Sequence, residues 1–301
     1  MNIEQYKTKI SREKGLKKLP KNIELNLDFN EEIKTKPMRT QSGGAPVAIM
    51  TEPRECLHGT CIFCPGGINS YFGSVPKSYT GNEPASMRAI RNKFDAYLQV
   101  FNRLEHYILL GQVPEKVELI IMGGTFLSYT IEYQDNFVRD AFQAMNDFGE
   151  MFFVDGKLDK NRFKVFFEFD LDFKSEERTK VIHDKLLTLK NESKLEDEQI
   201  KNETSKIRCV AMVIETKPDW CKEKHINQAL KLGTTRIEVG VQSLDDNVLK
   251  KVNRGHTVAD TIECFELLKD AGYKIITHWM PGLPNVKVED EVKNFKELFF
   301  D

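Results

Sequence analysis

The sequence lacks a long hydrophobic run, a large net charge and an apolar start. No apolar stretch approaches the ~18–20 residues that a transmembrane helix needs, and residues 1–15 contain no segment typical of a signal peptide. The chain has 44 Lys and Arg residues and 46 Asp and Glu residues. The resulting net charge of −2 excludes a bulk polycation or an acidic tail. With 40% hydrophobic residues the chain can bury a core, which excludes uniform disorder. We therefore expect a cytoplasmic protein without a membrane partner.

Cysteine is scarce and unevenly placed. Six cysteines in a chain of 301 residues do not suggest a disulfide framework, but Cys56, Cys61 and Cys64 fall within nine residues with the spacing C-x4-C-x2-C. Thiolates are soft ligands for iron–sulfur clusters and zinc. Three of them can bind three irons of a [4Fe–4S] cluster and leave the fourth free to chelate S-adenosylmethionine. An electron from the cluster would then cleave the sulfonium and release a 5′-deoxyadenosyl radical.

Zinc is the alternative metal for this group of thiols. A Cys3His site would use His58 as its fourth ligand, but zinc sites usually join two separated ligand pairs, and no second pair lies nearby in the sequence. We therefore favour the iron–sulfur interpretation. Cys209, Cys221 and Cys264 lie within predicted strands and helices and are interpreted as ordinary thiols.

Apolar runs and amphipathic segments alternate from residue 45 onward. The predicted strands are residues 45–50, 117–122, 209–215, 236–242 and 274–280. Amphipathic spacing predicts helices from 84 to about 110, over 131–148, from 219 to about 231, in segments up to 271, and near 288–299. This alternation predicts an α/β fold with a parallel sheet covered on both faces. Too few residues follow the fifth strand for a closed eight-stranded barrel, so we expect a partial (β/α) TIM-like barrel truncated at its C-terminus.

Two segments depart from this pattern. Residues 1–44 form a lead-in whose first 21 residues carry seven basic and two acidic side chains. This basic arm is either a solvated terminus or a contact for RNA phosphates, in which case the binding residues would be Lys7, Lys9, Arg12, Lys14, Lys17 and Lys18. The other segment, about 170–206, has 18 charged residues in 37 and is predicted to be a partly helical surface insertion within the barrel region 45–301.

Glycine and polar residues stand at the predicted carboxyl ends of the strands, where parallel α/β folds bind their ligands. They are Gly123, Gly124 and Thr125 after the second strand, Glu215 after the third, and Gln242 at the end of the fourth. We predict that they surround S-adenosylmethionine; a tight turn at the glycines and ordinary loop contacts for the others are the alternatives. His278 and Trp279 at the fifth strand are equally compatible with packing.

The stretches that contain these residues resemble the elongator protein 3 family, the catalytic subunit of Elongator, in its archaeal form. The resemblance rests on KPMRTQSGGAPVAIM (36–50), CLHGTCIFCPGG (56–67), SYTGNEPASMRAIRNKFDAY (78–97), VELIIMGGTF (117–126), IETKPDWC (214–221), RIEVGVQS (236–243), NRGHTVADTI (253–262) and HWMPGLPNV (278–286). It implies the radical S-adenosylmethionine part of an acyltransferase-type enzyme. Such an enzyme uses a [4Fe–4S] cluster, S-adenosylmethionine and acetyl-CoA to build 5-carboxymethyluridine at the wobble position of the tRNA anticodon stem-loop.

The resemblance also implies residue roles. Cys56, Cys61 and Cys64 would ligate the cluster, the strand-end residues would bind S-adenosylmethionine, and Lys116 would contact acetyl-CoA. Lys217 departs from the arginine that is usual in the family. The family's acetyltransferase domain is absent from this sequence; a separate chain that carries it, a truncated sequence and a partial gene are the alternatives. The alternatives are a non-catalytic module that binds tRNA or a partner, and another radical enzyme of the coproporphyrinogen-oxidase-like type.

Overall fold

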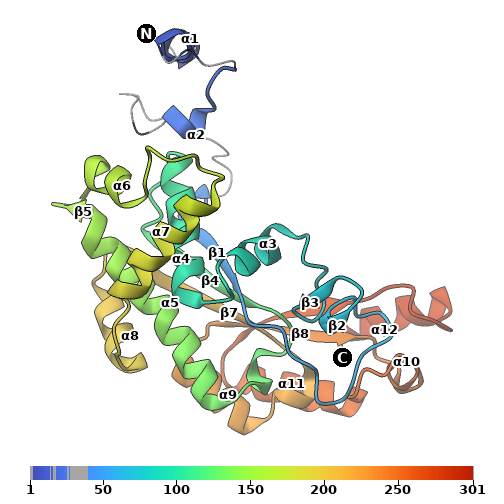
Figure 1. Cartoon of the computed structure of the whole chain (residues 1–301). Helices are drawn as coiled ribbons and strands as arrows, with labels where there is room; N and C mark the ends of the chain where they lie inside the picture. Colours follow the sequence, from blue (N-terminus) through green and yellow to red (C-terminus); the bar gives the residue numbers. More distant parts are fainter. Residues whose placement is uncertain (1–2, 14, 16–17, 26, 28–39, 301) are drawn as a thin grey trace.

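A five-stranded parallel sheet lies at the centre of the computed structural model, which describes residues 3–13, 15, 18–25, 27 and 40–300. Its strand order is β1–β4–β7–β8–β9 (Figure 1). The strands are β1 (Ala45–Met50), β4 (Lys116–Met122), β7 (Arg208–Thr216), β8 (Arg236–Gln242) and β9 (Lys274–Trp279). The strands lie in the sheet in the order in which they follow along the chain. Each crossover therefore adds its new strand next to the previous one, on the same side of it. The predicted α/β fold with the strand order of a partial barrel is confirmed.

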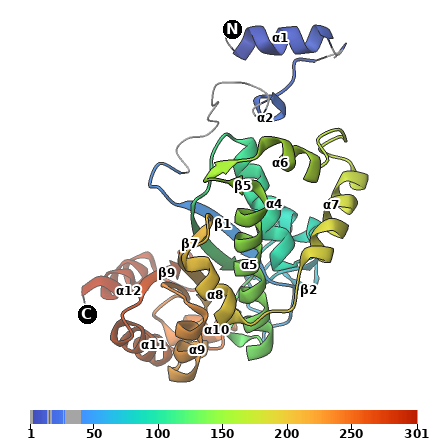
Figure 2. The same ribbon diagram turned by 90° about the vertical axis from the view of Figure 1, so that its left-hand side faces the viewer.

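Helices connect the strands and cover the sheet. Those between β1 and β7 are α3 (Pro84–Arg91), α4 (Ala96–Leu109), α5 (Ile131–Phe152), α6 (Lys160–Phe166), α7 (Glu176–Leu189) and α8 (Leu195–Glu203). Those that follow are α9 (Glu223–Leu232), α10 (Asp246–Lys251), α11 (Val258–Asp270) and α12 (Val288–Phe300). Figure 2 looks onto the layer that contains α5, α7 and α8. Among the residues that the structure describes, no helix combines the length and apolar character needed to cross a membrane.

Smaller elements complete the described part of the chain. They are the helices α1 (Ile3–Glu13) and α2 (Asn22–Leu25), the hairpin of β2 (Gly67–Ser70) with β3 (Gly73–Val75), and the hairpin of β5 (Phe153–Val154) with β6 (Lys157–Leu158). The β2–β3 hairpin directly follows the three-cysteine loop and was not predicted from the sequence. Its short strands carry few apolar residues, so no alternation of apolar and polar residues indicates them.

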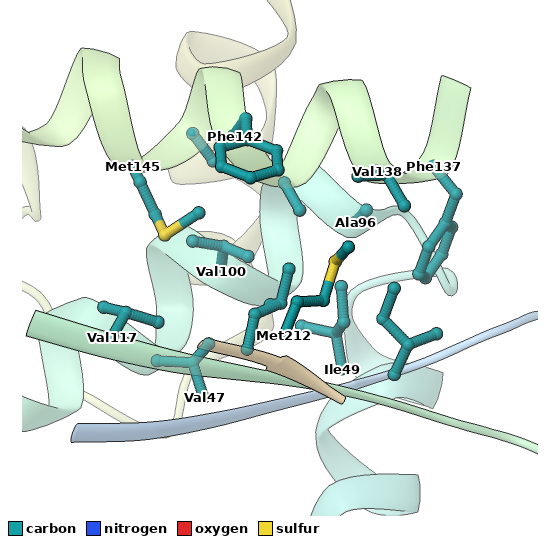
Figure 3. Packing of buried hydrophobic residues seen from close by; sticks show 14 of the residues in the cluster. Val47, Ile49, Ala96, Val100, Val117, Phe137, Val138, Phe142, Met145 and Met212 are labelled. Carbon is teal, nitrogen blue, oxygen red and sulfur yellow. The ribbon is translucent and has the colours of Figure 1, made fainter. Parts of the chain in front are cut away.

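The main core lies between the sheet and helices α4 and α5. Figure 3 shows Val138, Phe142 and Met145 of α5 above the strand residues Val47 and Val117, and all five are buried. Strands covered by helices need apolar side chains over their whole length, which explains the continuous apolar runs of the sequence.

Phe148 on α5 is the centre of an aromatic cluster and is fully buried. Its ring centroid lies 4.9–6.4 Å from those of Phe101, Phe152, Phe163 and Phe167. We expect Phe148→Ala to lower the free energy of unfolding by about 3–5 kcal/mol in urea denaturation, because truncation of a buried ring leaves a cavity. The control Val165→Ala, at an exposed position of α6, should change it by less than about 0.5 kcal/mol. Equal shifts for the two variants would contradict this role of Phe148.

The prediction of one helix over residues 84–110 is wrong, because α3 and α4 are separate. Between them Lys93 and Phe94 adopt φ angles of +53° and +56°, which no α-helix contains. Asp95 then accepts a hydrogen bond from the backbone N–H of Leu98 at 2.9 Å and begins α4 as its N-cap. The apolar spacing of three or four residues continues across the break, so periodicity alone did not reveal it.

The charged segment 170–206 forms α7 and α8 and packs more closely than its composition suggests. Ile182, Leu186 and Leu195 are buried in the main core. Arg178 forms a buried ion pair with Glu105 of α4, with 2.6 Å between Nη2 and Oε1. The prediction of a surface segment missed this packing, because the apolar residues are few but lie on the inner faces of the helices.

The outer edge of β1 is closed by side chains instead of a neighbouring strand. The carbonyl oxygens of Pro46, Ala48 and Met50 accept hydrogen bonds of 2.7–2.9 Å from the side chains of Tyr107, Arg88 and Gln99. The backbone N–H of Met50 donates in turn to the Gln99 side chain at 2.8 Å. Four of the groups that make an edge strand available to other chains are therefore satisfied here by α3 and α4.

Candidate cofactor site

Cys56, Cys61 and Cys64 line one cavity of about 350 Å³ at the carboxyl end of the sheet. The same cavity is lined by residues at the ends of four further strands, namely Gly124, Thr125, Glu215, Thr216, Lys217, Gln242, His278 and Trp279. The structure therefore brings the cysteine loop and the predicted strand-end residues together. Gly123 does not line the cavity, but it lies directly behind its wall.

Nitrogen atoms lie close to the sulfurs of Cys64 and Cys61. The backbone N–H of Ser78 donates to Sγ of Cys64 at 3.3 Å. Sγ of Cys61 lies 3.4 Å from Nε2 of His58 and 3.8 Å from Nη1 of Arg254. These contacts hold the two sulfurs at the cavity wall.

Burial disfavours the charged form of the third thiol, that of Cys56. It raises the pKa of Cys56, and the positive charge of Lys77 works against this rise. The ammonium of Lys77 is itself buried and pairs with Glu55 at 2.7 Å. A thiolate at Cys56 therefore depends on the cationic side chains around the cavity.

The glycines after the cysteines allow the β2–β3 hairpin to close over the loop. A Cβ atom on Gly66 would lie 2.1 Å from the carbonyl oxygen of Pro76 and 2.6 Å from that of Tyr79, so only glycine fits there. The close approach places Lys77, Ser78 and Tyr79 against the cavity. Close packing against residues 76 and 79 therefore explains the glycine that follows Pro65.

Glu215 is fixed by three hydrogen bonds at the centre of the strand ends. The backbone N–H groups of Gly123 and Gly124 donate to its Oε2 at 3.2 Å each, and the Tyr79 hydroxyl donates to Oε1 at 2.8 Å. The two glycines adopt φ angles of +122° and +104° to present these N–H groups. Burial raises the pKa of Glu215, and the hydrogen bond from Tyr79 opposes that rise. Gln242 also lies in the left-handed region, at φ +72°, where β8 ends.

Several cavity residues were not identified from the sequence. Three of them are Lys77, Tyr79 and Arg254, which line the cavity. His278, named from the sequence without an assigned role, also lines it and pairs with Glu238 at 3.1 Å, which raises the pKa of His278. The first three lie within stretches that carried the family resemblance or directly beside one, which was the available signal. Nothing in their local sequence indicated chemistry.

The structure does not bring Lys116 to this cavity. Lys116 is exposed at the first position of β4, the amino end, and lines a separate cavity of about 520 Å³ with residues that include Gly43, Gly44 and Gln112. The predicted contact with acetyl-CoA stays a prediction.

The described members of the predicted RNA-binding set do not line the cavity either. Helix α1 has no buried residue, and it carries Lys7, Lys9 and Arg12. Two of them form ion pairs within the helix, Lys7 with Glu4 at 2.8 Å and Lys9 with Glu13 at 3.8 Å. Lys18 is exposed, and Lys14 and Lys17 lie outside the described residues.

The arrangement of the thiols suits an iron–sulfur cluster. A [4Fe–4S] cluster needs three thiols around a space, because each cysteine binds a different iron. The cavity provides this arrangement.

S-adenosylmethionine also fits the groups present. Glu215 offers a half-buried carboxylate to a positively charged amine, and Gly124 leaves the wall beside it without a side chain. A Cβ atom there would approach Cβ of Lys77 to 3.4 Å, so a larger residue would fill part of this space. The other three cysteines, Cys209, Cys221 and Cys264, do not line the cavity.

Comparison with known proteins identifies the family of this chain. The radical SAM superfamily profile matches residues 53–298. A tRNA uridine(34) acetyltransferase from Methanocaldococcus infernus is 47% identical over 268 residues, which are 89% of this chain and 42% of that protein. Elongator complex protein 3 from Saccharomyces cerevisiae is 35% identical over 312 residues, which are 99% of this chain and 48% of that protein.

A solved structure has the same fold. The archaeal Methanocaldococcus infernus Elp3 with an N-terminal deletion superposes with a TM-score of 0.58 at 36% identity, covering 85% of this chain and 42% of that one. The chain thus spans less than half the length of these relatives. It belongs to the radical SAM superfamily, which implies a [4Fe–4S] cluster and S-adenosylmethionine, and over this region it is homologous to archaeal tRNA uridine(34) acetyltransferase and to Elongator complex protein 3.

Proposed function

We propose that this chain is the radical and tRNA-binding part of an enzyme that modifies the wobble uridine of tRNA. The product would be 5-carboxymethyluridine, with acetyl-CoA as co-substrate. The observation that carries the proposal is the shared cavity of Cys56, Cys61, Cys64 and Glu215 in a chain 47% identical to a tRNA uridine(34) acetyltransferase. A cytoplasmic location belongs to the same proposal.

The proposed residue roles are those predicted from the sequence and the family resemblance. The cluster ligands would be Cys56, Cys61 and Cys64, and the S-adenosylmethionine contacts would be Gly123, Gly124, Thr125, Glu215 and Gln242. When bound, these cofactors supply a one-electron cleavage of the sulfonium that yields a carbon-centred radical. Glu215 is oriented before any ligand arrives, because backbone N–H groups and the Tyr79 hydroxyl bind both of its oxygens. Preset orientation lowers the entropy lost on binding the amine.

The acyl donor requires a second surface. Lys116 is the proposed contact for acetyl-CoA, and its exposed position leaves the ammonium free to meet a phosphate group. Lys116 stands at the amino end of β4 and the cysteine cavity at the carboxyl end, so the proposed acetyl-CoA contact and the proposed cluster site lie at opposite ends of the strands.

The anticodon stem-loop is the proposed RNA partner, and the basic arm the proposed source of much of its affinity. Deletion of residues 1–21, or replacement of Lys7, Lys9, Arg12 and Lys18 by Gln, should weaken tRNA binding and flatten its salt dependence. Each lost phosphate contact should reduce the slope of log affinity against log salt by roughly 0.7–0.9. Filter binding at several salt concentrations measures this. Lys293→Gln, at an exposed position of α12, is the control; an arm variant that matches it would mean that the arm is a solvated terminus.

The whole proposal is tested with the reconstituted chain, a reductant, S-adenosylmethionine and tRNA. Formation of 5′-deoxyadenosine should rise with tRNA that carries uridine at position 34 and stay low with cytidine there. Cleavage that is indifferent to tRNA would favour another radical enzyme. Tight tRNA binding without any cleavage would favour a non-catalytic binding module.

A further inference from the structure

Arg254 lies buried on the wall of the cysteine cavity, only 9% exposed. It stands between α10 and α11, far in sequence from the cysteines. Its Nη1 lies 3.8 Å from Sγ of Cys61, and its Nη2 donates to the carbonyl oxygen of Gly240 at 2.5 Å. Its third nitrogen, Nε, is buried without a hydrogen-bond partner among the described residues.

The guanidinium has little freedom to turn away from the sulfur. A Cβ atom on Gly240 would lie 2.5 Å from Nη2, so the bare backbone of this glycine is what admits the side chain. Beside it, the Asn253 side chain donates to the carbonyl oxygen of Thr60, within the cysteine loop, at 3.0 Å. The segment that carries Arg254 and the loop that carries Cys61 are therefore bound to each other.

The charge of Arg254 also lacks a counter-ion. Two other buried cations line the cavity, and both have carboxylate partners: Lys77 pairs with Glu55 at 2.7 Å and Lys217 with Asp219 at 3.3 Å. No carboxylate pairs with Arg254 in the part of the chain that the structure describes. A buried, unpaired cation is costly, and a negatively charged occupant of the cavity would remove that cost.

We infer that Arg254 is a positioning residue for the cysteine site, which donates to the Cys61 sulfur and raises the reduction potential of the cluster bound there. Net charge and hydrogen bonds to the sulfurs are the levers by which a protein tunes such a cluster. A positive charge stabilises the reduced, more negative state, so it makes the cluster easier to reduce. The inference rests on the proposed cluster ligands and is independent of the RNA substrate.

The test is an electron-paramagnetic-resonance redox titration of the full chain after anaerobic reconstitution. Arg254→Gln removes the charge and should lower the equilibrium constant for reduction of the cluster at least tenfold. For a one-electron couple this corresponds to a fall of 59 mV in the reduction potential. Arg254→Lys retains a charge but not the planar fork, and should fall between Gln and the unaltered protein. Arg236→Gln, at the other end of β8, removes an arginine that pairs with Glu118 and should leave the potential unchanged.

Equal potentials for the unaltered protein and both Arg254 variants would overturn the inference and assign Arg254 a purely structural role. If the Gln variant fails to fold or to load iron, Arg254→Met, which also lacks the charge, takes its place, and an unaltered potential there overturns the inference equally. An unaltered chain that loads no cluster would instead remove the proposed cluster site, and this inference with it. Iron and sulfide analysis of every sample separates these outcomes.

Discussion

Replacement of Cys61 by alanine should abolish iron binding. The unaltered chain, reconstituted without oxygen, should bind about four irons and four sulfides and show the brown absorption of a [4Fe–4S] cluster. Cys61 is the most buried of the three cysteines, and its sulfur receives the contacts from His58 and Arg254. Without this thiolate one iron loses its protein ligand, and we expect the cluster to be lost.

Cys209→Ala is the matched control for this experiment. Cys209 lies in β7 outside the cavity, and its alanine variant should retain full iron and sulfide content. Stoichiometric zinc in the unaltered chain, or an iron content that Cys61→Ala does not change, would contradict the iron–sulfur assignment.

Replacement of Gly124 by valine should weaken S-adenosylmethionine binding at least tenfold while the iron content stays the same. Gly124 adopts φ +104°, which a β-branched residue reaches only at a cost of about 1–3 kcal/mol. The new side chain would also occupy the wall between Glu215 and Lys77. Equilibrium binding of labelled S-adenosylmethionine measures the loss.

Backbone strain alone has to be separated from loss of the binding surface. Gly272 has φ +75°, lies in the turn between α11 and β9, and has no atom within 4 Å of the point that a Cβ would occupy. Gly272→Val therefore introduces comparable strain away from the cavity and should leave the affinity unchanged. Equal affinities in Gly124→Val and the unaltered protein would mean that the ligand does not lie against this glycine.

The strands could be predicted because their sequences are continuous apolar runs. Residues 45–50 and 236–242 were predicted with the observed bounds, and the other three strands differ by one residue at one or both ends. Burial on both faces requires such runs, so local sequence carries the information. The break between α3 and α4 could not be found in the same way, since the helical spacing of apolar residues continues across it.

The site could be predicted only where one segment contains the chemistry. Cys56, Cys61 and Cys64 share a loop, and the glycines and Glu215 directly follow strands, so spacing and strand order were sufficient to place them near each other. Arg254 contacts Cys61 across 193 residues, and Tyr79 contacts Glu215 across 136. Contacts of this kind depend on how the loops fold over the sheet, and no periodicity in the sequence encodes them.

The closed edge of β1 links the behaviour of this strand to that of helix α4. The amide of Met50 is bound to Gln99 of α4 and not to another strand, so exchange of its hydrogen with solvent requires α4 to move away. In hydrogen-exchange terms, β1 and α4 should open as one cooperative unit. Such an opening would expose the carbonyl groups of Pro46 and Met50, and would convert part of a protected edge into a template for association between molecules.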